Sequence, residues 1–112
     1  MDIDCRLVTY GTLSPGRPNH GQLAMLGGEW KVGAVRGRLV EHGWGATLGY
    51  PALVLSSDAD AGVIAVDLLE CRDLPQHWAR LDAFEGAEYR RVPVWVELDG
   101  KVVEAWTYVA AA

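Results

Sequence analysis

The clearest alternation of hydrophobic and polar positions lies at the C-terminal end of the chain. Residues Tyr89–Leu98 and Lys101–Ala110 alternate as strands do, and Asp99-Gly100 between them is a strong signal for a two-residue β-hairpin turn. If that turn sets the register, one surface carries three cross-strand pairs, which we expect to face the core: Val96 with Val103, Val94 with Ala105 and Val92 with Thr107. The opposite surface carries Trp95, Trp106 and Tyr108.

Four further strands are predicted upstream, where β-favouring residues form short runs bounded by glycine, proline or polar turns. These runs are Cys5–Tyr10, Trp30–Val40, Ala52–Leu55 and Gly62–Leu69. Glycines at 33 and 37 interrupt the longest run, a pattern typical of a bend or a bulge in the wall of a small barrel. The stretch Glu41–Pro51 is predicted to be a connection, and Ser56–Ala61 a solvent-facing turn.

One principal helix is predicted late in the chain. Its apolar stripe consists of Leu74, Trp78, Leu81 and Phe84, with Asp73 as a candidate N-cap and Gly86 as the stop. A shorter helix is predicted from Asn19 through Leu26, after a loop rich in glycine and proline. Because the elements do not alternate regularly between strand and helix, we expect an α+β fold, a small mixed β-barrel with flanking short helices.

Composition and charge narrow the class of protein. A chain of 112 residues, 50% hydrophobic and without a visible repeat or linker, predicts a single domain over residues 1–112. The net charge of −5 argues against binding to nucleic acid or to an anionic membrane. Cys5 and Cys71 form no redox or zinc motif, and the acidic N-terminus lacks the features of a signal peptide. These features together predict a cytoplasmic protein.

The turn formed by Tyr10, Gly11, Thr12 and Leu13 is the first candidate site. A strand that ends in a Gly-Thr turn leaves backbone N–H groups unpaired by the sheet, and such groups can bind a carboxylate. A plain turn is the more common role for residues of these types. Both interpretations stay open when the turn is considered alone.

Glu85 is the second candidate, because it stands at the predicted end of the helix, between Phe84 and Gly86. The helix macrodipole disfavours a negative charge at a C-terminus, and apolar neighbours also favour the protonated carboxyl. We therefore expect Glu85 to have a pKa above that of an ordinary glutamate, as a general acid–base residue needs. An exposed glutamate at a helix end is the more common alternative.

Other residue types give no support for a cofactor or a metal. His20, His42 and His77 lie far apart without metal-ligand spacing, and we expect surface or loop roles for them. Ser14 lacks the context of a nucleophile elbow, and the glycines at 11, 16 and 21 match neither a P-loop nor a dinucleotide-binding motif. We expect a protein that uses neither cofactor nor metal.

The two candidate stretches in this order resemble the γ-glutamylcyclotransferase-like family, which includes AIG2-like and YtfP-like proteins. The resemblance rests on Y-G-T-L at residues 10–13, Asn19-His20 and L-D-x-F-E-G-x-E-Y-R-R at residues 81–91, followed by a closing hairpin. It implies the same small barrel, no metal, and cleavage of a γ-glutamyl amide to 5-oxoproline and a free amine. By the same resemblance, Tyr10, Gly11, Thr12 and Leu13 bind the substrate, and Glu85 is the catalytic acid–base residue. Tyr89 and Tyr108 are expected nearby.

The implied reaction fits these residue types. In a γ-glutamyl amide the α-amine can reach the γ-carbonyl and form a five-membered lactam, so the enzyme needs no nucleophile of its own. One carboxyl group can take the proton from the attacking amine and return it to the leaving nitrogen. Ser14-Pro15 follows Leu13 where relatives often carry a basic residue, a difference that predicts an altered preference for the amine part of the substrate.

Two alternatives to an enzyme remain. The first is a non-catalytic module that binds a small acidic metabolite on the same fold. The second is an interaction protein that exposes Trp95, Trp106 and Tyr108 as an aromatic face, since exposed apolar patches often mark partner surfaces.

Overall fold

The computed structural model of the chain describes residues 2–11, 13–40, 52–56 and 62–110. Thr12, the predicted connection Glu41–Pro51 and residues 57–61 of the predicted turn lie outside the described residues. Within the described ranges, no helix is long and apolar enough to cross a membrane.

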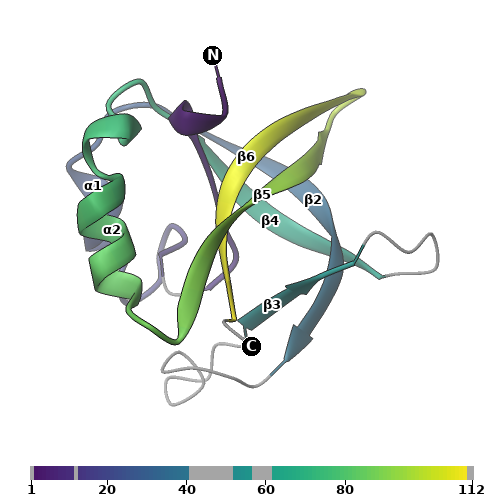
Figure 1. The fold of residues 1–112 in the computed structure, drawn as a ribbon. Helices are drawn as coiled ribbons and strands as arrows, with labels where there is room; N and C mark the ends of the chain where they lie inside the picture. The colour runs from purple at the N-terminus through teal and green to yellow at the C-terminus, as the bar shows by residue number, and fades with distance from the viewer. Residues whose placement is uncertain (1, 12, 41–51, 57–61, 111–112) are drawn as a thin grey trace.

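Strands form a nearly closed barrel. They are β1 (Arg6–Thr9), β2 (Glu29–Val40), β3 (Ala52–Leu55), β4 (Val63–Glu70), β5 (Tyr89–Leu98) and β6 (Lys101–Ala110). They are ordered β3-β2-β4-β1-β6-β5, and a pairing of Ala34 with Glu97 joins β2 to β5 and closes a ring of five strands, with β3 added beside β2. β1 and β6 run parallel, whereas the other pairs are antiparallel (Figure 1). The predicted mixed barrel is therefore confirmed.

The C-terminal hairpin has the register predicted from its turn. Gly100 adopts a φ of 75°, which the tight turn requires, and the three predicted cross-strand pairs are those observed. Their side chains contribute to the cluster inside the barrel, which draws on every strand and consists of Val8, Val35, Leu53, Val66, Leu68, Val94, Val96, Ala105 and Val109. Thr107 is fully buried in the same row and donates its hydroxyl hydrogen to the carbonyl oxygen of Val8.

The glycines of β2 allow close packing of neighbouring strands. Of the bend or bulge predicted there, β2 shows a curved course (Figure 1) and no bulge in its pairing with β4. Pairing with β4 continues without interruption from Glu29 to Arg36, and β2 then pairs with β3. A Cβ atom on Gly33 would lie 2.8 Å from Cγ1 of Val96, and one on Gly37 would clash with the carbonyl oxygen of Val54. Neighbouring strands therefore approach β2 more closely than any side chain at these positions would allow.

The helical elements pack against the outside of the barrel. They are η1 (Ile3–Cys5), α1 (Gly21–Ala24), η3 (Leu74–Gln76) and α2 (Trp78–Glu85), with α1 and α2 on the same side of the barrel in Figure 1. A second apolar cluster fills the space between them and the strands, and it consists of Leu7, Leu13, Leu23, Leu69, Cys71, Leu74, Trp78, Leu81 and Tyr108. The guanidinium of Arg80 in α2 donates to the backbone and side-chain oxygens of Gln22 in α1.

The principal helix is shorter than predicted, because the chain makes a separate 3-10 turn first. The N–H of His77 donates to the carbonyl oxygen of Leu74 at 2.8 Å, a tight bond that closes η3 before α2 begins. Pro75 lies in the first turn of η3, where its missing N–H is tolerated. Asp73 precedes η3 but makes no side-chain capping bond, and His20 takes the N-cap position predicted for Asn19.

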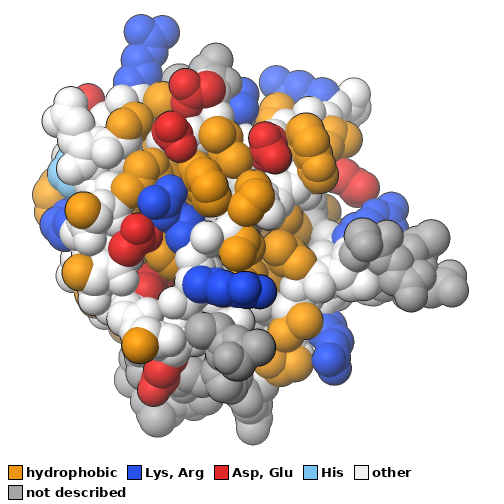
Figure 2. All heavy atoms as spheres, viewed as in Figure 1, with side chains coloured by type: hydrophobic (Ala, Val, Ile, Leu, Met, Phe, Trp, Pro, Cys, Tyr) orange, Lys and Arg blue, Asp and Glu red, His pale blue; other side chains and the backbone are white. Residues whose placement is uncertain are grey.

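The three aromatic residues share one face of the hairpin as predicted, but that face is not exposed throughout. Trp95 is 64% exposed, but Tyr108 is only 4% exposed and Trp106 is half-buried. The indole N–H of Trp106 donates to the carboxylate of Asp4, since η1 packs against this part of β6. Figure 2 shows hydrophobic side chains near the middle of the face over β5 and β6, with charged side chains around them.

Candidate functional site

Tyr10 follows the last residue of β1 and connects the end of this strand to β6. Its hydroxyl donates to the carbonyl oxygen of Tyr108 in β6, and its ring packs against the cluster inside the barrel. Burial raises the pKa of Tyr10, with a contribution from the negative charge of Glu85. The phenol therefore stays protonated and keeps this bond at physiological pH.

The turn after Tyr10 is shaped by hydrogen bonds within the chain. The N–H of Ser14 donates to the carbonyl oxygen of Gly11 at 3.1 Å, and the Ser14 hydroxyl donates to Oγ1 of Thr9 at 2.8 Å. Nδ1 of His20 lies 3.0 Å from the carbonyl oxygen of Leu13. Ser14 and Thr9 are both buried, so their bond is protected from water. These contacts give His20 the loop role expected for it and give Ser14 a structural role.

Glu85 is the last residue of α2, and the structure buries it. Gly86 follows with a φ of 77°, and its N–H donates to the carbonyl oxygen of Asp82 at 3.1 Å, which ends the helix. The Glu85 side chain is only 7% exposed, in contrast to an ordinary helix-end glutamate. Burial raises its pKa from 4.5 to about 7, the direction expected from the sequence.

The structure brings Glu85 close to the residues predicted to bind substrate. The charge of Glu85 contributes to the raised pKa values of both Tyr10 and Tyr108, so its carboxyl lies within electrostatic reach of both phenols. Leu13, from the turn, is buried in the same apolar cluster as Leu81 of α2. Tyr10 and Glu85, which lie far apart in sequence, are therefore close together where β1, β6 and α2 meet. Gly11 begins the turn, and Thr12 is outside the described residues.

A polar network next to Glu85 joins Tyr108, which was expected near the site, to Asp82 and Arg91, which were not assigned any role from the sequence. Arg91 donates two hydrogen bonds to the carboxylate of Asp82, and the hydroxyl of Tyr108 donates to the same carboxylate at 2.7 Å. Partial burial works against ionisation of Asp82, yet the bonds from Arg91 and Tyr108 hold its pKa below the usual value. Asp82 and Arg91 both belong to the stretch at residues 81–91 that carried the family resemblance. Their place in that stretch was the signal from which a role for them could have been predicted.

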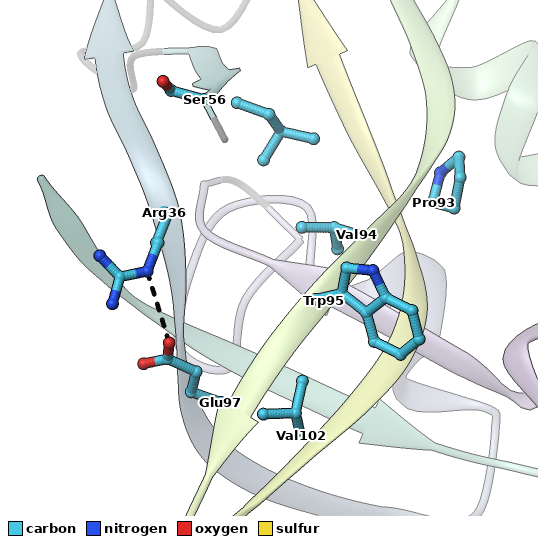
Figure 3. A pocket seen from close by; sticks show the side chains of 8 residues that line it. Arg36, Ser56, Pro93, Val94, Trp95, Glu97 and Val102 are labelled. Carbon is cyan, nitrogen blue, oxygen red and sulfur yellow. Dashed lines mark ion pairs between the residues drawn. The ribbon is translucent and has the colours of Figure 1, made fainter. Parts of the chain in front are cut away.

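A separate hollow lies in the barrel wall. It has a volume of about 340 Å³ and is lined by Arg36, Leu55, Ser56, Pro93, Val94, Trp95, Glu97 and Val102. Figure 3 shows Trp95 beside Pro93, with Arg36 and Glu97 facing each other as an ion pair at 3.5 Å. The hollow opens where β2 leaves β5 after their single pairing and turns to β3. It contains none of the predicted site residues.

Metal ligation finds no support in the described part of the chain, where no group of three or more His, Cys, Asp and Glu side chains could hold an ion. The chemistry available at the junction of β1, β6 and α2 is that of one carboxyl group with a pKa near neutrality beside two protonated phenols. Such a group can accept and return a proton near pH 7.

Solved structures with the same fold come from several organisms. YkqA from Bacillus subtilis is 27% identical with a TM-score of 0.70, and the match covers 95% of this chain and 35% of YkqA. An AIG2-like protein from Mus musculus is 24% identical with a TM-score of 0.64, with 96% of this chain and 77% of the mouse protein covered. Allophanate hydrolase from Kluyveromyces lactis has a TM-score of 0.69 at 15% identity, over 96% of this chain and 19% of that one.

Among curated proteins, none matches the chain. The chain spans about a third of the length of YkqA, and the likenesses below 25% identity concern the fold alone. A family model also matches nearly the whole chain, because residues 7–112 fit the family described as gamma-glutamyl cyclotransferase, AIG2-like. The chain therefore belongs to the gamma-glutamyl cyclotransferase, AIG2-like family.

Proposed function

We propose that this protein cleaves a γ-glutamyl amide to 5-oxoproline and a free amine, with Glu85 as the acid–base catalyst. The observation that carries the proposal is the burial of Glu85 at the end of α2, where its pKa is about 7 and it lies within electrostatic reach of Tyr10. A carboxyl with this pKa exists in both protonation states near neutral pH. It therefore suits a reaction in which one group must first accept a proton and then donate it.

The reaction uses the substrate's own nucleophile. Glu85 in its ionised form takes a proton from the α-ammonium, and the freed nitrogen attacks the γ-carbonyl carbon and forms the five-membered ring. The bond from that carbon to the amide nitrogen then breaks. Glu85 returns its proton to the leaving nitrogen, while a second proton from the former ammonium leaves to solvent or to the amine product. No water molecule is consumed, and the two products are 5-oxoproline and the amine.

The turn from Tyr10 to Leu13 is the proposed grip for the glutamyl part of the substrate. Its described residues Gly11 and Leu13 are held through their carbonyl oxygens, which contact the N–H of Ser14 and the ring of His20. Such bonds reduce the ordering that substrate binding requires. Backbone N–H groups in such a turn can orient the substrate carboxylate and stabilise the developing oxyanion. Thr12 belongs to this proposal by its place in the sequence.

The experiment is incubation of the protein with a panel of γ-glutamyl amides and γ-glutamyl amino acids, followed by chromatographic detection of 5-oxoproline. Glu85→Gln removes the proton shuttle with little change in shape and is expected to lose at least about 100-fold in kcat. Glu88→Gln is the matched control, because Glu88 is exposed three residues further on and should retain full activity. Activity that survives in the Glu85→Gln protein would reject Glu85 as the catalyst.

The same samples test the alternative of a non-catalytic binding module. Calorimetry that detects binding of a γ-glutamyl compound, with no product after long incubation, would replace the enzyme proposal with that alternative. Absence of both binding and product across the panel would remove the two together.

A further inference from the structure

Asp82 lies on α2 one turn before Glu85, and its carboxylate is held by two residues that face each other across the β5–β6 hairpin, Arg91 and Tyr108. We propose that Asp82, Arg91 and Tyr108 are positioning residues that dock the last turn of α2 onto the barrel and so fix the Glu85 carboxyl beside Tyr10. This inference rests on the proposed function for its catalytic consequence, but the contacts themselves do not depend on it.

The ion pair between Asp82 and Arg91 has a fixed geometry. Nε of Arg91 lies 2.9 Å from Oδ1 and Nη2 lies 3.2 Å from Oδ2, so the planar guanidinium meets the carboxylate with two parallel bonds. The same guanidinium lies 4.5 Å from the ring centre of Trp78 and 4.6 Å from that of Trp106. Asp82 is itself exposed, but contact with both indole rings limits the movement of Arg91, so it can orient Asp82 more firmly than an arginine without such contacts would.

Tyr108 connects the same carboxylate to the substrate turn. Its buried side chain donates to Oδ1 of Asp82 at 2.7 Å, and its backbone carbonyl accepts the hydroxyl hydrogen of Tyr10. One residue of β6 therefore contacts both the helix that carries Glu85 and the residue that begins the turn. The spacing between catalytic carboxyl and substrate turn is set through Tyr108.

The helix needs such docking because it is short. α2 contains eight residues, and helices of this length are not stable alone in water, so packing must hold it in place. Among the described residues, the charge of Glu85 contributes to the raised pKa values of Tyr10 at the end of β1 and Tyr108 in β6. The charge of Tyr89 in β5 also contributes to the pKa of Tyr10, and Asp82 lies on α2 itself. If the last turn of α2 moves away from the barrel, water reaches Glu85 and its pKa falls toward the ordinary value.

The test follows the pKa of Glu85 by NMR in full-length protein with ¹³C-labelled glutamate carboxyls, with Glu85→Gln used to assign the resonance. Asp82→Asn and Arg91→Gln change the local charge in opposite senses. Charge effects alone would lower the pKa of Glu85 in the first and raise it in the second. Arg91→Lys and Tyr108→Phe keep the charge unchanged, so charge effects alone would leave the pKa of Glu85 where it is. Arg90→Gln is the matched control, because the Arg90 side chain is exposed.

The proposal expects the pKa of Glu85 to fall by about one unit or more in both Asp82→Asn and Arg91→Gln, and by a smaller amount in Arg91→Lys and Tyr108→Phe. Arg90→Gln should leave it unchanged. Opposite shifts in the two charge variants, or no shift in folded Arg91→Lys and Tyr108→Phe proteins, would overturn the proposal. Far-ultraviolet circular dichroism identifies which variants are folded. If Asp82→Asn and Arg91→Gln do not fold, the pKa of Glu85 in Arg91→Lys and Tyr108→Phe decides the outcome.

Failure of this inference and failure of the proposed function are separable, because the titration needs no substrate. If the wild-type protein forms no 5-oxoproline but the expected pKa shifts occur, the positioning role stands and the catalytic proposal fails. If the protein is active, the positioning variants should lose about tenfold or more in kcat with little change in KM, since they displace the acid–base group and leave the substrate turn intact.

Discussion

Replacing Glu85 by Gln is predicted to make the protein more stable at alkaline pH while it removes activity. The physical reason is that the folded state buries a carboxyl group that prefers to be protonated there. A raised pKa in the folded state means that the native protein binds this proton more tightly than the unfolded chain does. The free energy of unfolding therefore falls as the pH rises from the unfolded pKa through the folded pKa.

The magnitude follows from the two pKa values. The pKa of Glu85 is 4.5 in the unfolded chain and about 7 in the folded protein, a difference of about 2.5 units. Each unit corresponds to about 1.4 kcal/mol, so ionised Glu85 destabilises the protein by about 3 kcal/mol at pH 8 relative to its protonated form. Gln is neutral at every pH and has nearly the same shape. For a domain of this size, about 3 kcal/mol corresponds to a rise in Tm of about 10 °C.

Thermal unfolding by circular dichroism at pH 5 and pH 8 measures this difference. The Glu85→Gln protein should exceed the wild type in Tm by about 10 °C at pH 8. At pH 5 the difference should shrink to about 3 °C, because Glu85 is protonated in the folded protein but already mostly ionised in the unfolded chain. Glu88→Gln should behave as the wild type at both values, since Glu88 is exposed. Equal Tm values for wild type and Glu85→Gln at pH 8 would refute the claim that Glu85 is buried and hard to ionise.

Three further predictions concern the site and the barrel. The kcat/KM for a γ-glutamyl substrate should rise about tenfold per pH unit below pH 7 and level off above it, because ionised Glu85 must accept the first proton. A pH–rate profile that already levels off near pH 4.5 would contradict the burial of Glu85. Ser14→Ala leaves the buried Thr9 hydroxyl without its donor, and urea unfolding should show a loss of about 1 kcal/mol together with a raised KM. Gly37→Ala forces a Cβ against the carbonyl oxygen of Val54 and should destabilise the barrel by about 1–3 kcal/mol, whereas Gly100→Asn, at an exposed hairpin turn, should cost less.

Local sequence signals predicted the elements that local chemistry controls. The Asp99-Gly100 turn determined the hairpin register, because a two-residue turn allows only one way of pairing the two strands. The alternation of valines then determined which face is buried. The end of α2 was predicted from Gly86, whose positive φ is easily adopted only by glycine. These predictions needed no knowledge of distant residues.

Closure of the barrel and burial of the site depend on residues far apart in sequence. β2 and β5 are joined through one pairing, Ala34 with Glu97, which no local pattern specifies. The division of the predicted helix at His77 depends on how η3 and α2 pack against β1 and β4, and helical spacing alone cannot show it.

Burial of Glu85 was likewise invisible in its own helix. Its environment comes from Tyr10 at one end of the chain and Tyr108 at the other, and only the folded barrel brings them to the end of α2. The Asp82–Arg91 pair was missed for the same reason, since the tight turn after α2 is what returns Arg91 to the side of the helix. Periodicity placed Glu85 at the helix end, but the tertiary structure determined its protonation.

The central claim is that the substrate's own α-amine cleaves the γ-glutamyl bond with Glu85 as the proton shuttle. Incubation in ¹⁸O-labelled water with mass spectrometry of the products tests it most directly. The account predicts 5-oxoproline and amine in equal amounts, with no ¹⁸O in the 5-oxoproline, and loss of both products in Glu85→Gln. Formation of ¹⁸O-labelled glutamate, which requires attack by water, would contradict it.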